Sequence, residues 1–240
     1  MIFNVQAMPI YRLIDELIFP PAELAEPDGL LAVGGDLGTE RLLLAYRRGI
    51  FPWYSEGDPI LWWSPEPRLI IEPGFIHVSK SLKKIIKQRL FEIKFDTAFR
   101  TVINNCANIP RKDGRGTWIT TEMKNAYIRL HHLGYAHSVE AWQGERLAGG
   151  LYGISLGRAF FGESMFFKVS NASKIALIAL ANILEKWNFN MIDCQVSTKH
   201  LMNMGAYEID RREFLQRLNY AMRFPTRQGL WTGLEWKPPW

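Results

Sequence analysis

The sequence predicts an α+β protein in which a small N-terminal domain, residues 1–66, precedes a larger mixed-sheet domain, residues 67–240. Three observations predict this class. The chain has 240 residues, against roughly 150 for an average domain. Prolines are concentrated up to residues 65–67, three tryptophans lie close together at residues 53–63, and the composition changes after that point. Beyond that point, strand-like segments come before, between and after helical ones, which is typical of one mixed sheet.

The overall composition is that of a globular protein. With 48% hydrophobic, 22% charged and 13% aromatic residues, the chain is unlike disordered, collagen-like, coiled-coil or disulfide-scaffold proteins. Its two cysteines, Cys106 and Cys194, have no CxxC spacing, so neither a disulfide framework nor a zinc knuckle is expected. The sequence contains neither an apolar run of membrane-spanning length nor a signal-peptide pattern at its start. We therefore expect a cytoplasmic protein with no membrane partner.

The N-terminal domain is expected to be rich in loops, with one clear helix over residues 40–48. Thr39 is its candidate N-cap and Gly49 its stop. The second domain opens with a strand over residues 69–72.

A basic amphipathic helix is predicted next, over residues 79–89. Its apolar face holds Leu82, Ile85, Ile86 and Leu90, and four lysines occupy the opposite face: Lys80, Lys83, Lys84 and Lys87. Residues 79–115 contain ten Lys/Arg and three Asp/Glu, a local charge of +7, whereas the rest of the chain is slightly acidic. Such clustering is typical of a surface that binds a phosphate backbone, although a four-lysine stripe alone is more often a solvated helix face.

The rest of the chain reads as helix, meander, helix, strand and two further helices. A helix over residues 120–133 ends at Gly134, and three strands over residues 138–142, 146–155 and 158–166 form an antiparallel meander. There follow a long helix over 172–187, a strand over 191–196, a short helix ending near Gly205, and a helix begun by the capping box of Asp210 and Glu213. This order is similar to the C-terminal half of the acyl-CoA N-acyltransferase (GNAT) fold, so we expect a GNAT-like domain.

Seven short strings carry a more specific resemblance: EPDGLLAVGGDL (26–37), RGIFPW (48–53), LWWSPEPR (61–68), GTWIT (116–120), FGESMF (161–166), IDCQ (192–195) and MGAY (204–207). Together, and in this order, they resemble the bacterial leucyl/phenylalanyl-tRNA–protein transferases, over about residues 19–214.

The resemblance implies an aminoacyltransferase that moves Leu or Phe from aminoacyl-tRNA onto the α-amino group of proteins beginning with Arg or Lys. Met is a further candidate donor residue. The product is a destabilising N-terminus read by the N-degron degradation pathway. The resemblance implies no metal and no nucleotide cofactor, and we expect a monomer whose partners are aminoacyl-tRNA and the acceptor proteins.

The family's catalytic Asp and Gln correspond to Asp193 and Gln195. Strand alternation predicts that these two side chains share one face and that Cys194 points to the other. A glutamine amide does not titrate near neutral pH, so we expect Gln195 to accept a hydrogen bond from the amine and aim it. Asp193 would orient Gln195 or hold the incoming cation; the structural alternative is a strand-end Asp bound to backbone N–H groups.

Glu163 follows an apolar strand segment, and buried unpaired carboxylates are rare. It is either a carboxylate satisfied by a structural partner or, as the resemblance implies, a second acidic contact for the acceptor's positive N-terminus.

The resemblance also implies an apolar pocket for the Leu or Phe side chain. Three of its positions fall at i, i+3 and i+7 on one helix face, a stripe that is more often plain core. Leucine stands at three sites where the family often has Met or Phe, which leaves the preference between Leu and Phe open. The pocket positions are Leu151, Phe160, Leu177, Leu180, Leu184 and Ile192.

Aromatic and basic residues are expected to bind the tRNA. Trp53 and Trp118 stand in polar, glycine- or proline-containing surroundings that suit an exposed stacking platform for the terminal adenosine, and the resemblance adds Tyr127. The four lysines of the basic helix would then contact phosphates of the acceptor stem without reading its sequence.

Three other functions and one other mechanism remain as alternatives. Acetyl transfer from coenzyme A is disfavoured because residues 167–173 contain no glycine to cradle a pyrophosphate. A cell-wall peptidyltransferase would use the same donor with another acceptor. A covalent route through Cys194 and a non-enzymatic RNA-binding module are the other two. None of the histidines has a metal-ligand spacing: His77, His131, His132, His137 and His200.

Overall fold

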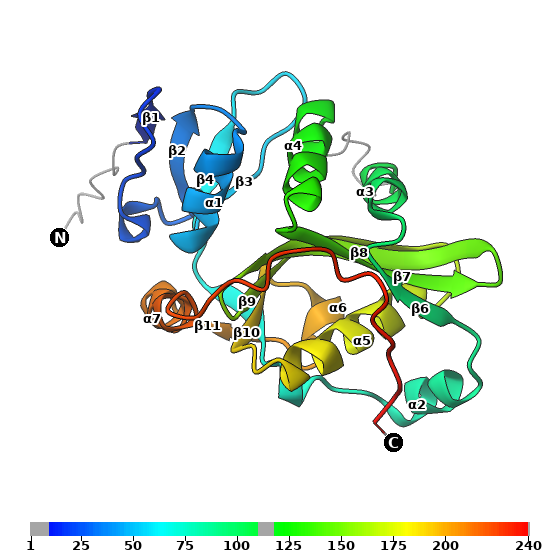
Figure 1. The fold of residues 1–240 in the computed structure, drawn as a ribbon. Helices are drawn as coiled ribbons and strands as arrows, with labels where there is room; N and C mark the ends of the chain where they lie inside the picture. Colours follow the sequence, from blue (N-terminus) through cyan, green and yellow to red (C-terminus); the bar gives the residue numbers. More distant parts are fainter. Residues whose placement is uncertain (1–9, 110–117, 240) are drawn as a thin grey trace.

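The computed structural model describes residues 10–109 and 118–239. Part of the basic segment and the first two residues of the GTWIT string lie outside the described residues. Within them, the chain forms two sheets flanked by helices (Figure 1).

The first sheet belongs to the N-terminal part of the chain and has four short strands in the order β1-β2-β4-β3. β1 runs parallel to β2, and the other pairs are antiparallel. Helix α1 (Thr39–Arg47) begins one residue earlier than predicted and is capped at Gly38, not at Thr39. The sequence did not reveal these strands because two to five residues are too few to show alternation. They are β1 (Tyr11–Leu13), β2 (Leu30–Gly34), β3 (Phe51–Pro52) and β4 (Leu61–Trp63).

The second sheet has seven strands and contains the predicted meander. Its order is β11-β5-β10-β9-β8-β7-β6, with β10 parallel to β9 and every other pair antiparallel. The predicted α+β class with one mixed sheet is therefore confirmed. The strands are β5 (Arg68–Ile71), β6 (Glu92–Phe95), β7 (Ala136–Gln143), β8 (Arg146–Leu156), β9 (Ala159–Phe167), β10 (Met191–Gln195) and β11 (Tyr207–Ile209).

Helices cover both faces of this sheet (Figure 1). The apolar helix α5 (Ala172–Lys186) packs on one face, against side chains such as Val139, Phe160 and Ile192. Helices α3 (Phe99–Ala107) and α4 (Thr121–His132) pack on the other. The remaining helices are α2 (Lys80–Lys87), α6 (Lys199–Met202), α7 (Arg211–Ala221) and two 3-10 turns, η1 (Ala22–Leu24) and η2 (Pro73–Phe75).

Helices α2, α4 and α7 begin at side-chain caps, of which the sequence predicted the one at Asp210. Ser79, Thr120 and Asp210 each accept a hydrogen bond from the backbone N–H three residues later, at 2.7–3.2 Å. On α2, Leu82 and Ile86 are buried as predicted. Leu90 is half exposed beyond the helix end and does not join that apolar face.

The N-terminal part and the mixed sheet share one hydrophobic core. Trp62 and Leu42 belong to the same buried cluster as Tyr127 of α4 and Phe214 of α7. Residues 66 and 67 lie between the two sheets, and the division into two domains there remains a proposal. No helix within the described ranges is both long and apolar enough to cross a bilayer.

Candidate active site

A pocket of about 200 Å³ lies where β3 of the N-terminal sheet meets strands β8–β10 and helices α5 and α6. Five of the six side chains expected to form the acyl pocket line it together: Leu151, Phe160, Leu177, Leu180 and Ile192. Leu184 does not line it, because this residue lies a further turn along α5 and is buried in the core. Met165 and Leu201, which the sequence did not indicate, also belong to the apolar wall.

The polar end of the pocket is formed by Glu163 of β9 and Gln195 of β10. The Glu163 carboxylate is buried and accepts three hydrogen bonds. Tyr46 donates to Oε1 at 2.7 Å, Tyr127 donates to Oε2 at 2.9 Å, and the Gln195 amide donates to Oε1 at 2.9 Å. The hydroxyl oxygens of the two tyrosines are themselves 2.5 Å apart.

The pKa of Glu163 is raised to about 7, mainly because burial penalises the charged form. Its hydrogen bonds act in the opposite direction, and the nearby negative charge of Asp193 adds to the rise. Burial also raises the pKa values of Tyr46 and Tyr127, so both phenols are neutral. A carboxyl group that titrates near neutral pH inside a pocket is suited to proton transfer.

Asp193 is fully buried and faces away from the pocket. Its carboxylate forms a bidentate ion pair with Arg68 of β5, at 2.8 and 2.7 Å, and accepts the Gln195 backbone N–H at 2.9 Å. The Arg68 guanidinium lies over the Phe214 ring, 4.3 Å from its centre. The carboxylate is therefore not placed to hold an incoming cation. Among the residues that line the pocket, it accepts a hydrogen bond from the Gln195 backbone N–H.

The predicted alternation along β10 is wrong at its last residue. A β-bulge interrupts the pairing with β5 between Asp193 and Gln195, and Gln195 has a φ of +64°. As a result Gln195 does not share the face of Asp193. It lines the pocket beside Cys194, on the side that the sequence assigned to Cys194 alone.

Cys194 is thus present in the pocket but is a poor nucleophile. Burial raises the pKa of its thiol well above the ordinary value, and the charge of Asp193 raises it further. The thiol stays protonated at neutral pH, which disfavours the covalent route considered from the sequence.

The aromatic residues divide into two groups. Trp53 and Trp118 line the pocket, and the side chain of Trp53 is 37% exposed, as a stacking platform requires. Tyr127 is fully buried and does not line the pocket. The expectation that Tyr127 stacks on the terminal adenosine is therefore wrong. Its hydroxyl instead donates a hydrogen bond to Glu163.

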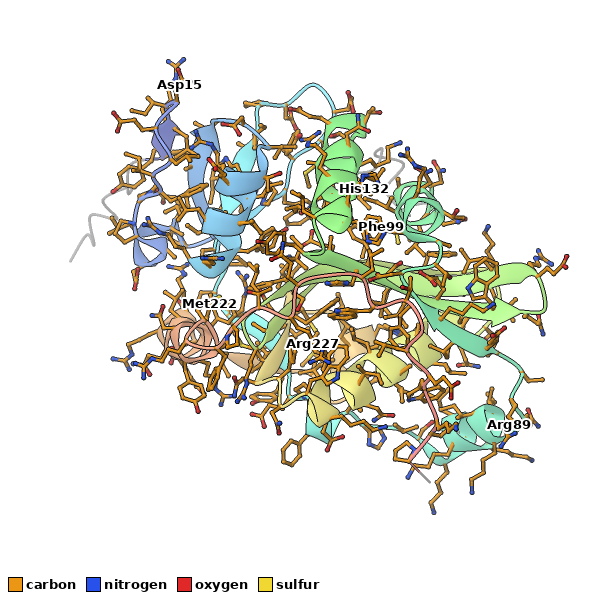
Figure 2. The ribbon with its side chains drawn as sticks, in the orientation of Figure 1. Asp15, Arg89, Phe99, His132, Met222 and Arg227 are labelled. Atoms are coloured by element: carbon orange, nitrogen blue, oxygen red, sulfur yellow. The ribbon has the colours of Figure 1, made fainter. Side chains whose placement is uncertain are left out.

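The four lysines Lys80, Lys83, Lys84 and Lys87 are exposed on α2, and none of them lines the pocket. Figure 2 shows Arg89, just beyond this helix, at the opposite end of the molecule from Asp15 of the N-terminal part. The lysine face could meet only a ligand that extends well outside the pocket, as a tRNA does.

Sequence reasoning missed Tyr46 and Arg68 as parts of the site. Arg68 ends the LWWSPEPR string, but nothing in that string indicates that its guanidinium pairs with Asp193. Tyr46 is an ordinary core position of α1, and nothing local shows that its hydroxyl meets a carboxylate 117 residues away.

A family model described as leucyl/phenylalanyl-tRNA protein transferase matches residues 70–219, and the model of the N-terminal domain of that family matches residues 35–66. Among solved structures, L-PGS from Bacillus licheniformis aligns over 70% of this chain and 54% of its own, with a TM-score of 0.37 and 8% identity.

Several curated relatives carry the name leucyl/phenylalanyl-tRNA–protein transferase. The relative from Desulfatibacillum aliphaticivorans is 58% identical over 94% of this chain and 97% of its own. That from Myxococcus xanthus is 56% identical over 94% and 97%, and that from Azoarcus sp. 62% identical over 84% and 86%. On these matches, this chain belongs to the leucyl/phenylalanyl-tRNA protein transferase family.

Proposed function

We propose that this chain transfers Leu or Phe from aminoacyl-tRNA to the α-amino group of proteins that begin with Arg or Lys. The new N-terminus would mark those proteins for the N-degron degradation pathway in the cytoplasm. One observation carries the proposal: a single pocket joins an apolar wall to the polar groups of Glu163 and Gln195, with Trp53 and Trp118 also lining it.

The reaction depends more on positioning the amine and the ester than on activating either of them chemically. The ester of an aminoacyl-tRNA is already reactive, and holding an amine against its carbonyl carbon can supply about 7 to 11 kcal/mol. The α-amino group has an ordinary pKa of about 7.7 to 8.0, so a useful fraction is neutral near pH 7.

The donor is placed by the apolar wall and the tryptophans. Leu151, Phe160 and Leu180 would surround its Leu or Phe side chain, while Trp53 and Trp118 stack on the terminal adenosine. Phosphates further along the tRNA would meet the lysines of α2.

The acceptor is placed by Gln195 and Glu163. Because the Gln195 amide donates its N–H to Glu163, its carbonyl oxygen is left to accept a hydrogen bond from the incoming amine. The negative charge of Glu163 favours the cationic N-terminus of an Arg or Lys acceptor. The enzyme is proposed to act as a monomer.

The deciding experiment incubates the purified protein with labelled Leu-tRNA or Phe-tRNA and peptides that begin with Arg, Lys or Ala. We expect label on the Arg and Lys peptides only. Two further arms, with acetyl-coenzyme A as donor and with a cell-wall precursor peptide as acceptor, test the rival enzymes. Label on the Ala peptide alone, or transfer only in a rival arm, would overturn the proposal, and tRNA binding without any transfer would favour the RNA-binding module.

A further inference from the structure

The oxygens of Glu163, Tyr46 and Tyr127 form a closed ring of short contacts. The distances are 2.7 Å from Tyr46 to Glu163 Oε1, 2.9 Å from Tyr127 to Glu163 Oε2, and 2.5 Å between the two hydroxyl oxygens. The ring is buried on the tyrosine side, and only Glu163 also lines the pocket. It joins three elements that are distant in sequence: α1, α4 and β9.

The number of protons in the ring depends on the state of Glu163. Three oxygen–oxygen contacts need three bridging protons, and two neutral phenols supply two. When Glu163 is ionised and both tyrosines donate to it, the 2.5 Å contact between the hydroxyl oxygens has no proton. One proton added to the carboxylate completes the set.

The hydrogen bond from Gln195 determines which carboxylate oxygen of Glu163 receives that proton. Oε1 already accepts the Gln195 amide and the Tyr46 hydroxyl, so it is the acceptor side of the carboxyl group. A proton on Oε2 would be donated to Tyr127, Tyr127 would then donate to Tyr46, and Tyr46 to Oε1. Every contact in the ring is then a hydrogen bond with one proton.

We propose that Glu163 is the catalytic base of the transfer reaction, and that Tyr46 and Tyr127 are positioning residues which hold it ready to take one proton from the acceptor's α-ammonium group. This rests on the function proposed above.

In the first step, Oε2 of Glu163 takes a proton from the –NH₃⁺ group and leaves a neutral amine. The amine nitrogen attacks the ester carbonyl carbon, forming the C–N bond, and the C–O bond to the terminal ribose of the tRNA breaks. A second proton passes from the nitrogen to the departing ribose oxygen, and Glu163 returns its own proton to water.

The surroundings of Glu163 agree with this role. The titratable and charged groups that act on it are Tyr46 from α1, Tyr127 from α4, Tyr152 from β8, and Asp193 from β10 with its partner Arg68 from β5. The three phenols are neutral because burial raises their pKa values. The pKa of Glu163 itself, about 7, lets the group exist in both protonation states at neutral pH.

The first test is Glu163→Gln, which keeps the shape and removes the base. At pH 7 we expect kcat for Leu transfer to an Arg peptide to fall roughly 5- to 10-fold, because only about a sixth to a tenth of an α-amino group with a pKa of about 7.7 to 8.0 is neutral there without a base. The wild-type rate should rise through pH of about 7. The variant should rise only as the amine loses its own proton, near pH of about 7.7 to 8.0, so its deficit shrinks with pH.

Glu140→Gln is the matched control, since Glu140 is another buried, hydrogen-bonded carboxylate, on β7 and outside the pocket. Its kcat per folded molecule should stay unchanged. A Glu163→Gln variant with full kcat, or with a loss confined to the KM of the acceptor, would show that Glu163 only contacts the acceptor.

The second test follows the proton without any substrate. In protein labelled with carboxyl-¹³C glutamate, the Glu163 resonance should titrate near pH 7, and in Tyr127→Phe its midpoint should move, with the pH–rate profile moving equally. A wild-type midpoint near the ordinary glutamate value of about 4.3, or a midpoint unmoved in Tyr127→Phe, overturns the inference. The titration of Glu163 can be measured even if the wild type transfers nothing to Arg peptides. That second result would contradict the proposed function, independently of the titration.

Discussion

Gln195 reaches the pocket because of its backbone conformation. A regular strand would place it on the side of Asp193, but the bulge and a positive φ turn it toward Glu163. For a residue other than glycine this conformation is uncommon and is kept only where the surroundings hold it. Here the Gln195 N–H is bound by Asp193 and the side-chain amide by Glu163. Asp193 therefore acts on the site through the backbone of its neighbour.

The Asp193–Arg68 pair leads to a prediction on stability. Asp193→Asn should lower the free energy of unfolding by about 3 to 5 kcal/mol, because it leaves the buried charge of Arg68 without its partner. Urea unfolding followed by circular dichroism measures this change.

An exposed ion pair provides the control. Glu92 pairs with Lys94 at 3.3 Å, and their side chains are 65% and 39% exposed, so Glu92→Gln should cost about 1 kcal/mol or less. Equal losses for the two variants would contradict the distinction. The activity of any Asp193 variant is informative only at a temperature where the variant is shown to be folded.

At the scale of single elements, α5 shows how one apolar stripe serves two purposes. Leu177, Leu180 and Leu184 lie on one face as the spacing predicts, but only the first two line the pocket, because the helix continues past it into the core. Periodicity identifies the buried face of a helix without indicating which turns border a cavity.

This difference predicts a change in specificity. Leu180→Ala widens the pocket and removes contacts with a leucyl side chain, so the ratio of Leu to Phe transfer should fall roughly tenfold or more. Competition between Leu-tRNA and Phe-tRNA measures the ratio. Leu184→Ala, one turn further along, should cost about 2 to 5 kcal/mol of stability and leave the ratio unchanged. A changed ratio in Leu184→Ala alone would refute the assignment.

Helix α2 has a basic face whose function can be tested by salt dependence. Replacing Lys83, Lys84 and Lys87 with Ala should weaken tRNA binding and reduce the slope of log Kd against log salt by about 2 to 3, one unit for each lost phosphate contact. Three exposed arginines on other elements form the matched control, and their replacement should leave the slope as it is: Arg12, Arg47 and Arg212. An unchanged slope in the lysine variant would exclude α2 from the tRNA contact.

At the scale of the whole molecule, the C-terminal segment closes over the sheet and α5 (Figure 1). The Trp231 ring stacks on His137 with centres 3.7 Å apart, and its backbone N–H donates to the buried Asp96 at 2.7 Å. Asp96 also accepts a hydrogen bond from Ser138 N–H and contacts His137. The end of the chain is thus part of the core on the α5 side.

Trp231→Ala should accordingly lower the free energy of unfolding by about 3 to 5 kcal/mol, since it removes a large buried side chain. Its neighbour Leu230 is 56% exposed, so Leu230→Ala should change stability by no more than about 0.5 kcal/mol. Thermal or urea unfolding distinguishes them, and a Trp231→Ala protein as stable as the wild type would show that the segment is not anchored.

The sequence by itself determined the α+β class, the meander, the long helix and the helix cap at Asp210, because these depend on periodicity and on residues within a few positions of one another. The resemblance to one family also indicated Gln195, Glu163, Trp53 and six pocket positions, five of which line the pocket. Only the tertiary structure decided which side chains of distant elements contact one another. The pairing of Arg68 with Asp193, the ring of Tyr46, Tyr127 and Glu163, the bulge that turns Gln195 and the exclusion of Leu184 all depend on contacts between distant elements. No local pattern records such contacts, because a buried tyrosine or arginine looks the same in sequence whether its polar atoms meet a catalytic group or a structural one.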